Sequence, residues 1–219
     1  MRCLGRLVVS DPSCGHSWCV GLRTFAVLCL MLGSVVRAQA YETVVCFADS
    51  MATEPGPTTN YCAQLQTLRP DLTVKNRSAP GRTTPLALSQ VSAVVDEACG
   101  TTSCLVLIHH GLNDLSLPDP DAWTTAKRLR GIWSTAATGP SRDAWILTLL
   151  PFLDSTLNNS PFARDVGNAA LALARRRIPV FDARDLFSFD GWWGRTTDGT
   201  HLNESGALLI ATALADAIP

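Results

Sequence analysis

Asp198 and His201 form the pair of residues whose types and spacing point most directly to catalysis. A carboxylate three residues before a histidine, in one loop, can accept a hydrogen bond from Nδ1 and leave Nε2 free as a general base. Beyond residue 40 the other histidines are His109 and His110, and neither has a loop carboxylate so placed. The pair predicts acid–base chemistry of the kind that activates a serine hydroxyl.

Three further segments could supply a nucleophile and the donors that stabilise an oxyanion. Ser50 follows an apolar run, so its hydroxyl would project at the carboxyl end of a strand, where the next helix offers backbone N–H groups. Gly81 could bring a backbone N–H close to a ligand, and Asn113 could add an amide donor. Taken singly, these residues also fit a helix cap, a loop glycine and an Asn-Asp turn.

The elements that must position these segments are visible in the apolar patterning. Five runs are apolar without alternation, which is typical of strands covered on both faces and favours a parallel sheet. The expected strands are Thr43–Phe47, Leu72–Lys75, Cys104–His109, Ala144–Leu150 and Ile178–Asp182.

Segments with helical spacing separate these runs. The expected helices are Thr59–Leu68, Pro85–Ala98, Asp121–Thr135, Phe162–Arg177 and Glu204–Ile218. The alternation predicts an α/β fold with right-handed crossovers and helices on both faces of the sheet. Ligands bind such sheets beyond the carboxyl ends of the strands, where the segments of Ser50, Gly81 and Asn113 begin.

In order and placement, the four segments resemble the sequence blocks of the SGNH, or GDSL-type, hydrolases, which are serine esterases and lipases. The matching segments are Ala48-Asp49-Ser50, Gly81, Gly111-Leu112-Asn113-Asp114 and Asp198-Gly199-Thr200-His201. The resemblance covers roughly residues 42–218. It implies a single three-layer α/β/α domain with a flavodoxin-like, five-stranded parallel sheet.

The resemblance also implies a role for each residue. Ser50 would be the nucleophile, His201 the general base and Asp198 the residue that orients His201. The N–H groups of Ser50 and Gly81 and the side chain of Asn113 would form the oxyanion hole. The reaction would be ester hydrolysis through an acyl-enzyme, with no metal or organic cofactor.

The sequence departs from the family pattern at Ala48, where the usual residue is glycine. A methyl group is tolerable there if the residue has ordinary strand dihedrals, and strained if it needs a positive φ. We expect the alanine to be tolerated.

Two classes of ester remain open as substrates: carbohydrate O-acetyl esters, and short-chain or lysophospholipid esters. Trp192 and Trp193 precede Asp198 and could stack a sugar or line an acyl pocket, or they could cover the end of the sheet as core. A non-catalytic ligand-binding protein on the same fold is the alternative function. The presence of Ser50 and His201 argues against it.

Composition and charge exclude other classes of function. The chain has 219 residues, 47% of them hydrophobic, with 18 basic against 19 acidic residues. A net charge of −1 lacks the basic excess of a nucleic-acid-binding protein. No apolar run reaches the roughly 18 to 20 residues of a membrane-spanning helix. We expect a monomer whose partner is a small-molecule ester.

Residues 1–40 have the features of a secretory signal peptide. Arginines precede an apolar stretch over Thr24–Val36, and Ala38-Gln39-Ala40 has the form of a cleavage site. A buried N-terminal helix and a signal anchor are the alternatives. Export to the periplasm or the extracellular space is therefore expected, with residues 41–219 forming the hydrolase domain.

Four of the eight cysteines lie beyond the expected cleavage site, an even number that suits an oxidising compartment. Cys99 and Cys104 are close enough to close a small loop, and this disulfide is favoured. Cys46 is either a buried thiol or the partner of Cys62. A zinc site is disfavoured because there is no Cys-x-x-Cys pair or neighbouring histidine cluster.

Overall fold

The computed structural model describes residues 41–150, 160–187 and 193–219, and the expected leader at 1–40 lies outside them. Its five strands are all parallel and lie in the order β2-β1-β3-β4-β5. The strands are β1 (Thr43–Ala48), β2 (Thr73–Asn76), β3 (Cys104–His109), β4 (Arg142–Leu147) and β5 (Val180–Phe181). This is the strand order of flavodoxin-like sheets, so the predicted fold class is confirmed.

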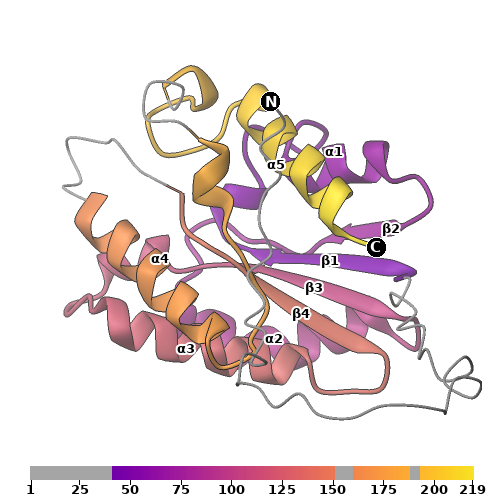
Figure 1. The fold of residues 1–219 in the computed structure, drawn as a ribbon, viewed down its shortest axis with the longest axis horizontal. Coiled ribbons are helices and arrows are strands. Elements are labelled where there is room, and N and C mark those ends of the chain that lie inside the picture. The colour runs from indigo at the N-terminus through magenta and orange to yellow at the C-terminus, as the bar shows by residue number, and fades with distance from the viewer. Residues whose placement is uncertain (1–40, 151–159, 188–192) are drawn as a thin grey trace, which may run out of the picture.

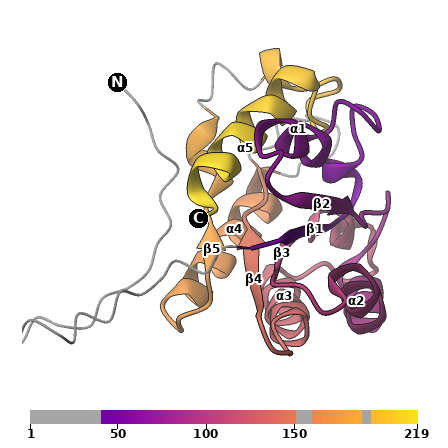
Figure 2. The same ribbon diagram turned by 90° about the vertical axis from the view of Figure 1, so that its right-hand side faces the viewer.

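Helices cover both faces of the sheet (Figure 1). They are α1 (Tyr61–Leu68), α2 (Thr84–Cys99), α3 (Ala122–Ala136), α4 (Ser160–Ala174) and α5 (Glu204–Ala217). Figure 2 shows α1 and α5 side by side on one face, while α2 and α3 pack together on the other, where α3 also contacts α4. The sheet is the middle layer of an α/β/α sandwich. None of these described helices is long and apolar enough to cross a membrane.

The two central strands, β1 and β3, set the level at which the functional loops begin. Every residue of both strands is buried, as their unbroken apolar runs predict. Their register pairs Thr43 with Cys104 and Ala48 with His109. Both strands therefore end at the same height, and the segments that follow them leave the sheet as neighbours.

β1 and β2 lie within one residue of their predicted bounds, whereas β4 and β5 differ more. The larger differences arise because pairing, not hydrophobicity, decides where a strand ends. β4 begins at Arg142, which pairs with Cys104, and it ends at Leu147 although the chain stays buried through Leu150. β5 is limited to the two residues that pair with β4. The predicted strand over 178–182 is correspondingly too long.

The predicted end of the fourth helix at Arg177 is also wrong. The helix α4 ends at Ala174, and the three arginines that follow form a turn. Arg177 has a φ of 64° and donates its N–H to the Ala174 carbonyl. This bond spans three residues instead of the four of an α-helix, and a residue in the left-handed region cannot continue one, so the chain has left the helix before Arg177.

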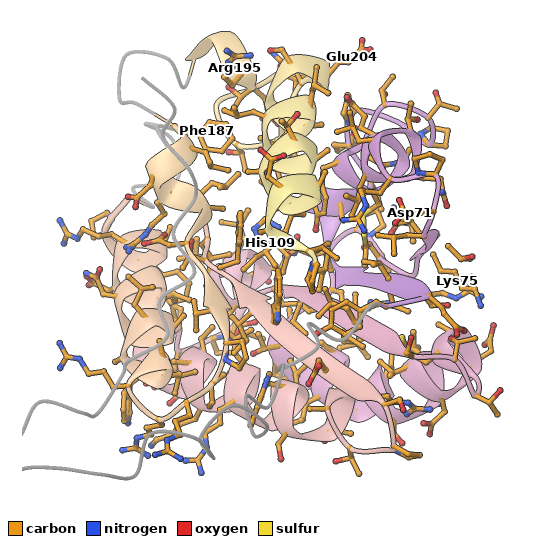
Figure 3. The ribbon with its side chains drawn as sticks, turned by 45° about the vertical axis from the view of Figure 1, so that its right-hand side comes forward. Asp71, Lys75, His109, Phe187, Arg195 and Glu204 are labelled. Atoms are coloured by element: carbon orange, nitrogen blue, oxygen red, sulfur yellow. A yellow bond between two sulfur atoms is a disulfide. The ribbon has the colours of Figure 1, made fainter. Side chains whose placement is uncertain are left out.

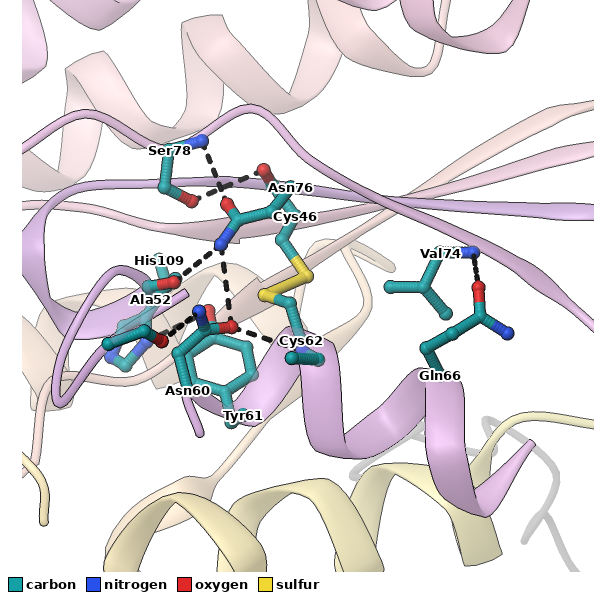
Figure 4. The surroundings of a disulfide bond; sticks show 12 residues. Cys46, Ala52, Asn60, Tyr61, Cys62, Gln66, Val74, Asn76, Ser78 and His109 are labelled. Atoms are coloured by element: carbon teal, nitrogen blue, oxygen red, sulfur yellow. Dashed lines mark hydrogen bonds between the residues drawn. A yellow bond between two sulfur atoms is a disulfide. The ribbon is translucent and has the colours of Figure 1, made fainter. Parts of the chain in front are cut away.

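Both possible disulfides are formed. Cys99–Cys104 joins the end of α2 to the start of β3, as favoured from the sequence. Cys46–Cys62 ties β1 to α1 (Figure 4). Beside it, Asn76 donates from Nδ2 to the Ala52 carbonyl at 2.6 Å, which connects the end of β2 to the turn after β1. The bridge and this hydrogen bond together fix the segment that follows β1.

Candidate active site

Ser50 lies in the turn directly after β1, at the carboxyl edge of the sheet. Asp49 caps this turn by accepting the Met51 N–H at 3.1 Å. Ala48 is the last residue of β1, and its carbonyl accepts the Ala79 N–H from the neighbouring loop. Ala48 is not among the described residues with a positive φ. The strand position of Ala48 agrees with the expectation that its methyl group is tolerated.

The loop before α5 brings Asp198 and His201 to Ser50, which lies 151 positions before His201 in the sequence. His201 Nε2 lies 3.0 Å from Ser50 Oγ, and His201 Nδ1 lies 2.7 Å from Asp198 Oδ2. Figure 3 shows Arg195 and Glu204 near the beginning of α5, which is the helix that follows this loop. The predicted nucleophile, base and orienting carboxylate therefore stand in one line of hydrogen bonds.

The carboxylate of Asp198 is stabilised in its ionised form. Its partial burial would raise the pKa, but hydrogen bonds from His201 and Thr200 outweigh this effect and hold the pKa below the ordinary value. Its Oδ1 accepts the backbone N–H groups of Thr200 and His201 at 2.9 and 2.7 Å, which leaves Oδ2 for the imidazole. An ionised partner on Nδ1 favours the tautomer in which Nε2 accepts a proton.

Asn113 lies in the 3-10 turn Leu112–Ser116 after β3. This turn begins at Gly111, which has a φ of 126° and where an added Cβ would come within 3.2 Å of Thr125. The backbone and the packing both require glycine there. The Nδ2 atom of Asn113 lies 3.1 Å from Asp49 Oδ2 and 3.4 Å from the Arg82 carbonyl. The amide nitrogen thus lies against the turn that carries Ser50.

Gly81 lies in the loop between β2 and α2, with a φ of 72° that favours glycine. It is exposed, and an added Cβ would meet no atom within 4 Å. The loop approaches the site through its neighbours, because Ala79 bonds to the Ala48 carbonyl and the Arg82 carbonyl faces Asn113. Gly81 is not one of the described residues that line the cavity beside Ser50.

A cavity of about 280 Å³ opens beside Ser50. Its lining residues are Ser50, Leu112, Asn113, Leu115, Ser116, Thr200 and His201. Ligand pockets commonly hold about 300–1,000 Å³, so this cavity suits a small group. Sequence reasoning did not identify Leu112, Leu115 or Thr200 as lining residues, although each lies within two residues of a predicted site residue.

The tryptophan pair cannot be placed in this cavity. Trp192 lies outside the described residues, and only the backbone of Trp193 is described, in the 3-10 turn Trp193–Arg195. Their substrate contacts stay predictions. Within the described ranges, no three His, Cys, Asp or Glu side chains gather as a metal site would require.

Two fully buried carboxylates support the site and were not assigned a role from the sequence. Burial raises the pKa of Asp49 to about 7, although hydrogen bonds from Met51 and Asn113 and the nearby His201 oppose the shift. Asp114 accepts the backbone N–H of Thr84 at 2.7 Å and the hydroxyl of Thr125 at 2.7 Å. Asp114 thereby ties the turn that carries Asn113 to α2 and α3.

Comparisons with known proteins show the family to which the chain belongs. Residues 45–209 match the model of the GDSL-like Lipase/Acylhydrolase family. A search of curated proteins gives no match.

Solved structures share the fold at low sequence identity. A lipolytic G-D-S-L family protein from Veillonella parvula is 18% identical, with a TM-score of 0.69 over 80% of this chain and 96% of that chain. The psychrotrophic esterase EstA from Pseudoalteromonas is 17% identical, with a TM-score of 0.65 over 81% and 96%. The lipase/acylhydrolase from Enterococcus faecalis is 18% identical, with a TM-score of 0.65 over 81% and 95%. The family model spans residues 45–209, which is most of this chain. The chain therefore belongs to the GDSL-like lipase/acylhydrolase family and is an ester hydrolase.

Proposed function

We propose that the chain is a secreted serine esterase that hydrolyses small acyl or acetyl esters through an acyl-enzyme on Ser50. One observation carries the proposal: hydrogen-bond distances of 2.7 and 3.0 Å join Asp198 to His201 and His201 to Ser50. A serine hydroxyl is a weak nucleophile, and a base within hydrogen-bond reach is what activates it.

In the proposed mechanism, His201 Nε2 accepts the Ser50 proton as Oγ attacks the carbonyl carbon of the ester. The negative charge on the carbonyl oxygen is stabilised by the Ser50 N–H, the Asn113 amide and the Gly81 N–H. His201 then gives its proton to the leaving alcohol, and the acyl group stays on Ser50. Water that is deprotonated by His201 releases the acid and restores the serine.

The cavity supports a small acyl group and leaves both substrate classes open. Leu112 and Leu115 give it apolar lining, which suits the methyl of an acetyl ester as well as a short acyl chain. A panel of acetylated sugars, short-chain acylglycerols and lysophospholipids, assayed with the wild type and Ser50→Ala, tests this point. The preferred class is the one that the wild type hydrolyses with the highest kcat/KM, provided that Ser50→Ala abolishes this hydrolysis.

Export is part of the proposal. The segment 1–40 has signal-peptide features, and both disulfides join cysteines that lie beyond the expected cleavage site. Expression of the full chain in an exporting host is expected to yield a secreted protein that begins at Tyr41. N-terminal sequencing measures this directly, and a product that retains residues 1–40 would contradict it.

The decisive assay for the function uses the secreted protein with p-nitrophenyl acetate and p-nitrophenyl butyrate at neutral to alkaline pH. Hydrolysis that is lost in Ser50→Ala supports the esterase. A folded wild-type protein that hydrolyses neither ester would instead favour the alternative, a non-catalytic ligand-binding protein on this fold.

A further inference from the structure

Asp49 contacts two separate parts of the site with one side chain. It lies between the end of β1 and Ser50, and none of its surface is exposed. Its Oδ1 accepts the Met51 N–H and its Oδ2 accepts Asn113 Nδ2, each at 3.1 Å. The carboxylate therefore joins the nucleophile turn to the amide proposed as an oxyanion donor.

Capping the turn does not by itself explain a buried carboxylate. Asp121 caps α3 in the same way, accepting the Thr124 N–H at 2.7 Å, and it is exposed. Hydrogen bonds from Thr124 hold the pKa of Asp121 below the ordinary value, whereas burial raises the pKa of Asp49. Burying a carboxylate is costly, and serine or asparagine would cap a turn about as well. The bond to Asn113 distinguishes Asp49 from a simple cap.

The bond decides which end of the Asn113 amide faces the site. An asparagine side chain has an NH2 donor and a carbonyl acceptor, and an ionised carboxylate can only accept. One hydrogen of Nδ2 is used by Asp49. The second has only a long contact, 3.4 Å, with the Arg82 carbonyl, and Asn113 lines the cavity with Ser50. A reversed amide would present its oxygen to a developing oxyanion and repel it.

We propose that Asp49 is a positioning residue whose carboxylate holds the Asn113 amide with its nitrogen toward the oxyanion. The inference rests on the proposed function, in which Asn113 stabilises the transition state. Because an oxyanion develops only during reaction, loss of the positioning should lower kcat and leave KM nearly unchanged.

Asp49→Asn is the sharpest test. The new side chain keeps the size and can still accept the Met51 N–H, but it sets one NH2 group against the NH2 group of Asn113. With p-nitrophenyl acetate at about pH 8, where the Asp49 carboxyl is mostly ionised, kcat is expected to fall by about 10- to 100-fold while KM changes less than about twofold. Asp121→Asn makes the same change at an exposed cap and is expected to leave both constants unchanged.

A double-mutant cycle separates positioning from a general structural effect. Asn113→Ala alone is expected to lower kcat by about 10²- to 10³-fold. Adding Asp49→Asn to it should change kcat by less than about twofold, because no amide is left to orient. Losses that multiply in the double variant, or an unchanged kcat in Asp49→Asn alone, would overturn the proposal.

A second variant guards against failure to fold. Asp49→Ser can cap the Met51 N–H with its hydroxyl and introduces no opposing NH2 group, and the same non-additivity with Asn113→Ala is expected. If Ser50→Ala still hydrolyses the ester, the proposed function itself fails. If Ser50→Ala and Asn113→Ala lose activity while both Asp49 variants keep the full kcat, only the role of Asp49 fails.

Discussion

Ser50 depends on two partners from one distant loop, so replacing any one of the three residues should remove most of the enzyme's activity. Ser50→Ala and His201→Ala are each expected to lower kcat by roughly 10⁴-fold or more, because either change removes the activated hydroxyl. Asp198→Asn should be roughly 100-fold milder, since His201 keeps its contact with Ser50. Ester hydrolysis by each variant, with circular dichroism as the check on folding, measures this. A His201→Ala variant near the wild-type rate would remove the histidine from the mechanism.

The buried carboxylate of Asp49 makes a separate prediction about stability and pH. Its pKa is about 7 in the folded protein against an ordinary 3.8, so the folded state holds this proton more tightly. The resulting stabilisation is complete below about pH 4 and is lost as the pH rises to about 7. The melting temperature of the wild type relative to Asp49→Asn should therefore fall over this range and then level off. Parallel melting curves from pH 4 to 8 would contradict the assignment.

For single residues, the sequence predicts contacts within one loop better than contacts between loops. The spacing of Asp198 and His201 places them together, and the structure joins them at 2.7 Å. The bond between Asp49 and Asn113 crosses 64 positions and follows from the pairing of β1 with β3. No local pattern encodes that distance, which is why the role of Asp49 emerges only from the fold.

Among the elements, the buried central strands were the easiest to predict, and the ends of β4 and β5 were the hardest. β3 matches its predicted range because an unbroken apolar run coincides with full pairing. β4 starts at Arg142, a polar residue that no hydrophobic pattern would include. Its start is fixed by the register with β3, which is a property of the partner strand.

The turn that carries Asn113 is held by Asp114, and this predicts a large stability effect. Asp114→Ala would leave the Thr84 N–H and the Thr125 hydroxyl buried without their acceptor. Each such group costs about 1–3 kcal/mol, so the free energy of unfolding should fall by roughly 3 kcal/mol or more. Asp121→Ala, at an exposed helix cap, should cost much less, because water can take the place of the lost acceptor there. Urea unfolding of both variants tests the difference, and equal losses would contradict the anchoring role.

Over the whole molecule, the strand order explains why distant motifs meet. From β1 the chain adds β2 on one side of the sheet, and it then adds β3, β4 and β5 on the other side. In such folds ligands bind in the crevice between the two strands at which this change occurs, here β1 and β3. Ser50 and Asn113 follow these two strands, and the loop before α5 adds His201 from above the same edge. The motifs could be assigned to this edge from the sequence because each follows or precedes a predicted element in the right order.

The two disulfides act on the whole chain by restricting its unfolded state, and they should do so unequally. Cys46–Cys62 spans 16 positions and Cys99–Cys104 spans 5. In the chain-entropy model these loops correspond to about 3 and about 2 kcal/mol.

Replacing Cys46 and Cys62 together with alanine should therefore lower the free energy of unfolding more than the same change at Cys99 and Cys104. All four sulfurs belong to buried residues, so the two double variants lose similar packing and form a matched pair. Urea unfolding under non-reducing conditions gives both values. A larger loss at Cys99 and Cys104 would mean that the short bridge stabilises the folded state directly, because the restriction of the unfolded chain predicts the opposite order.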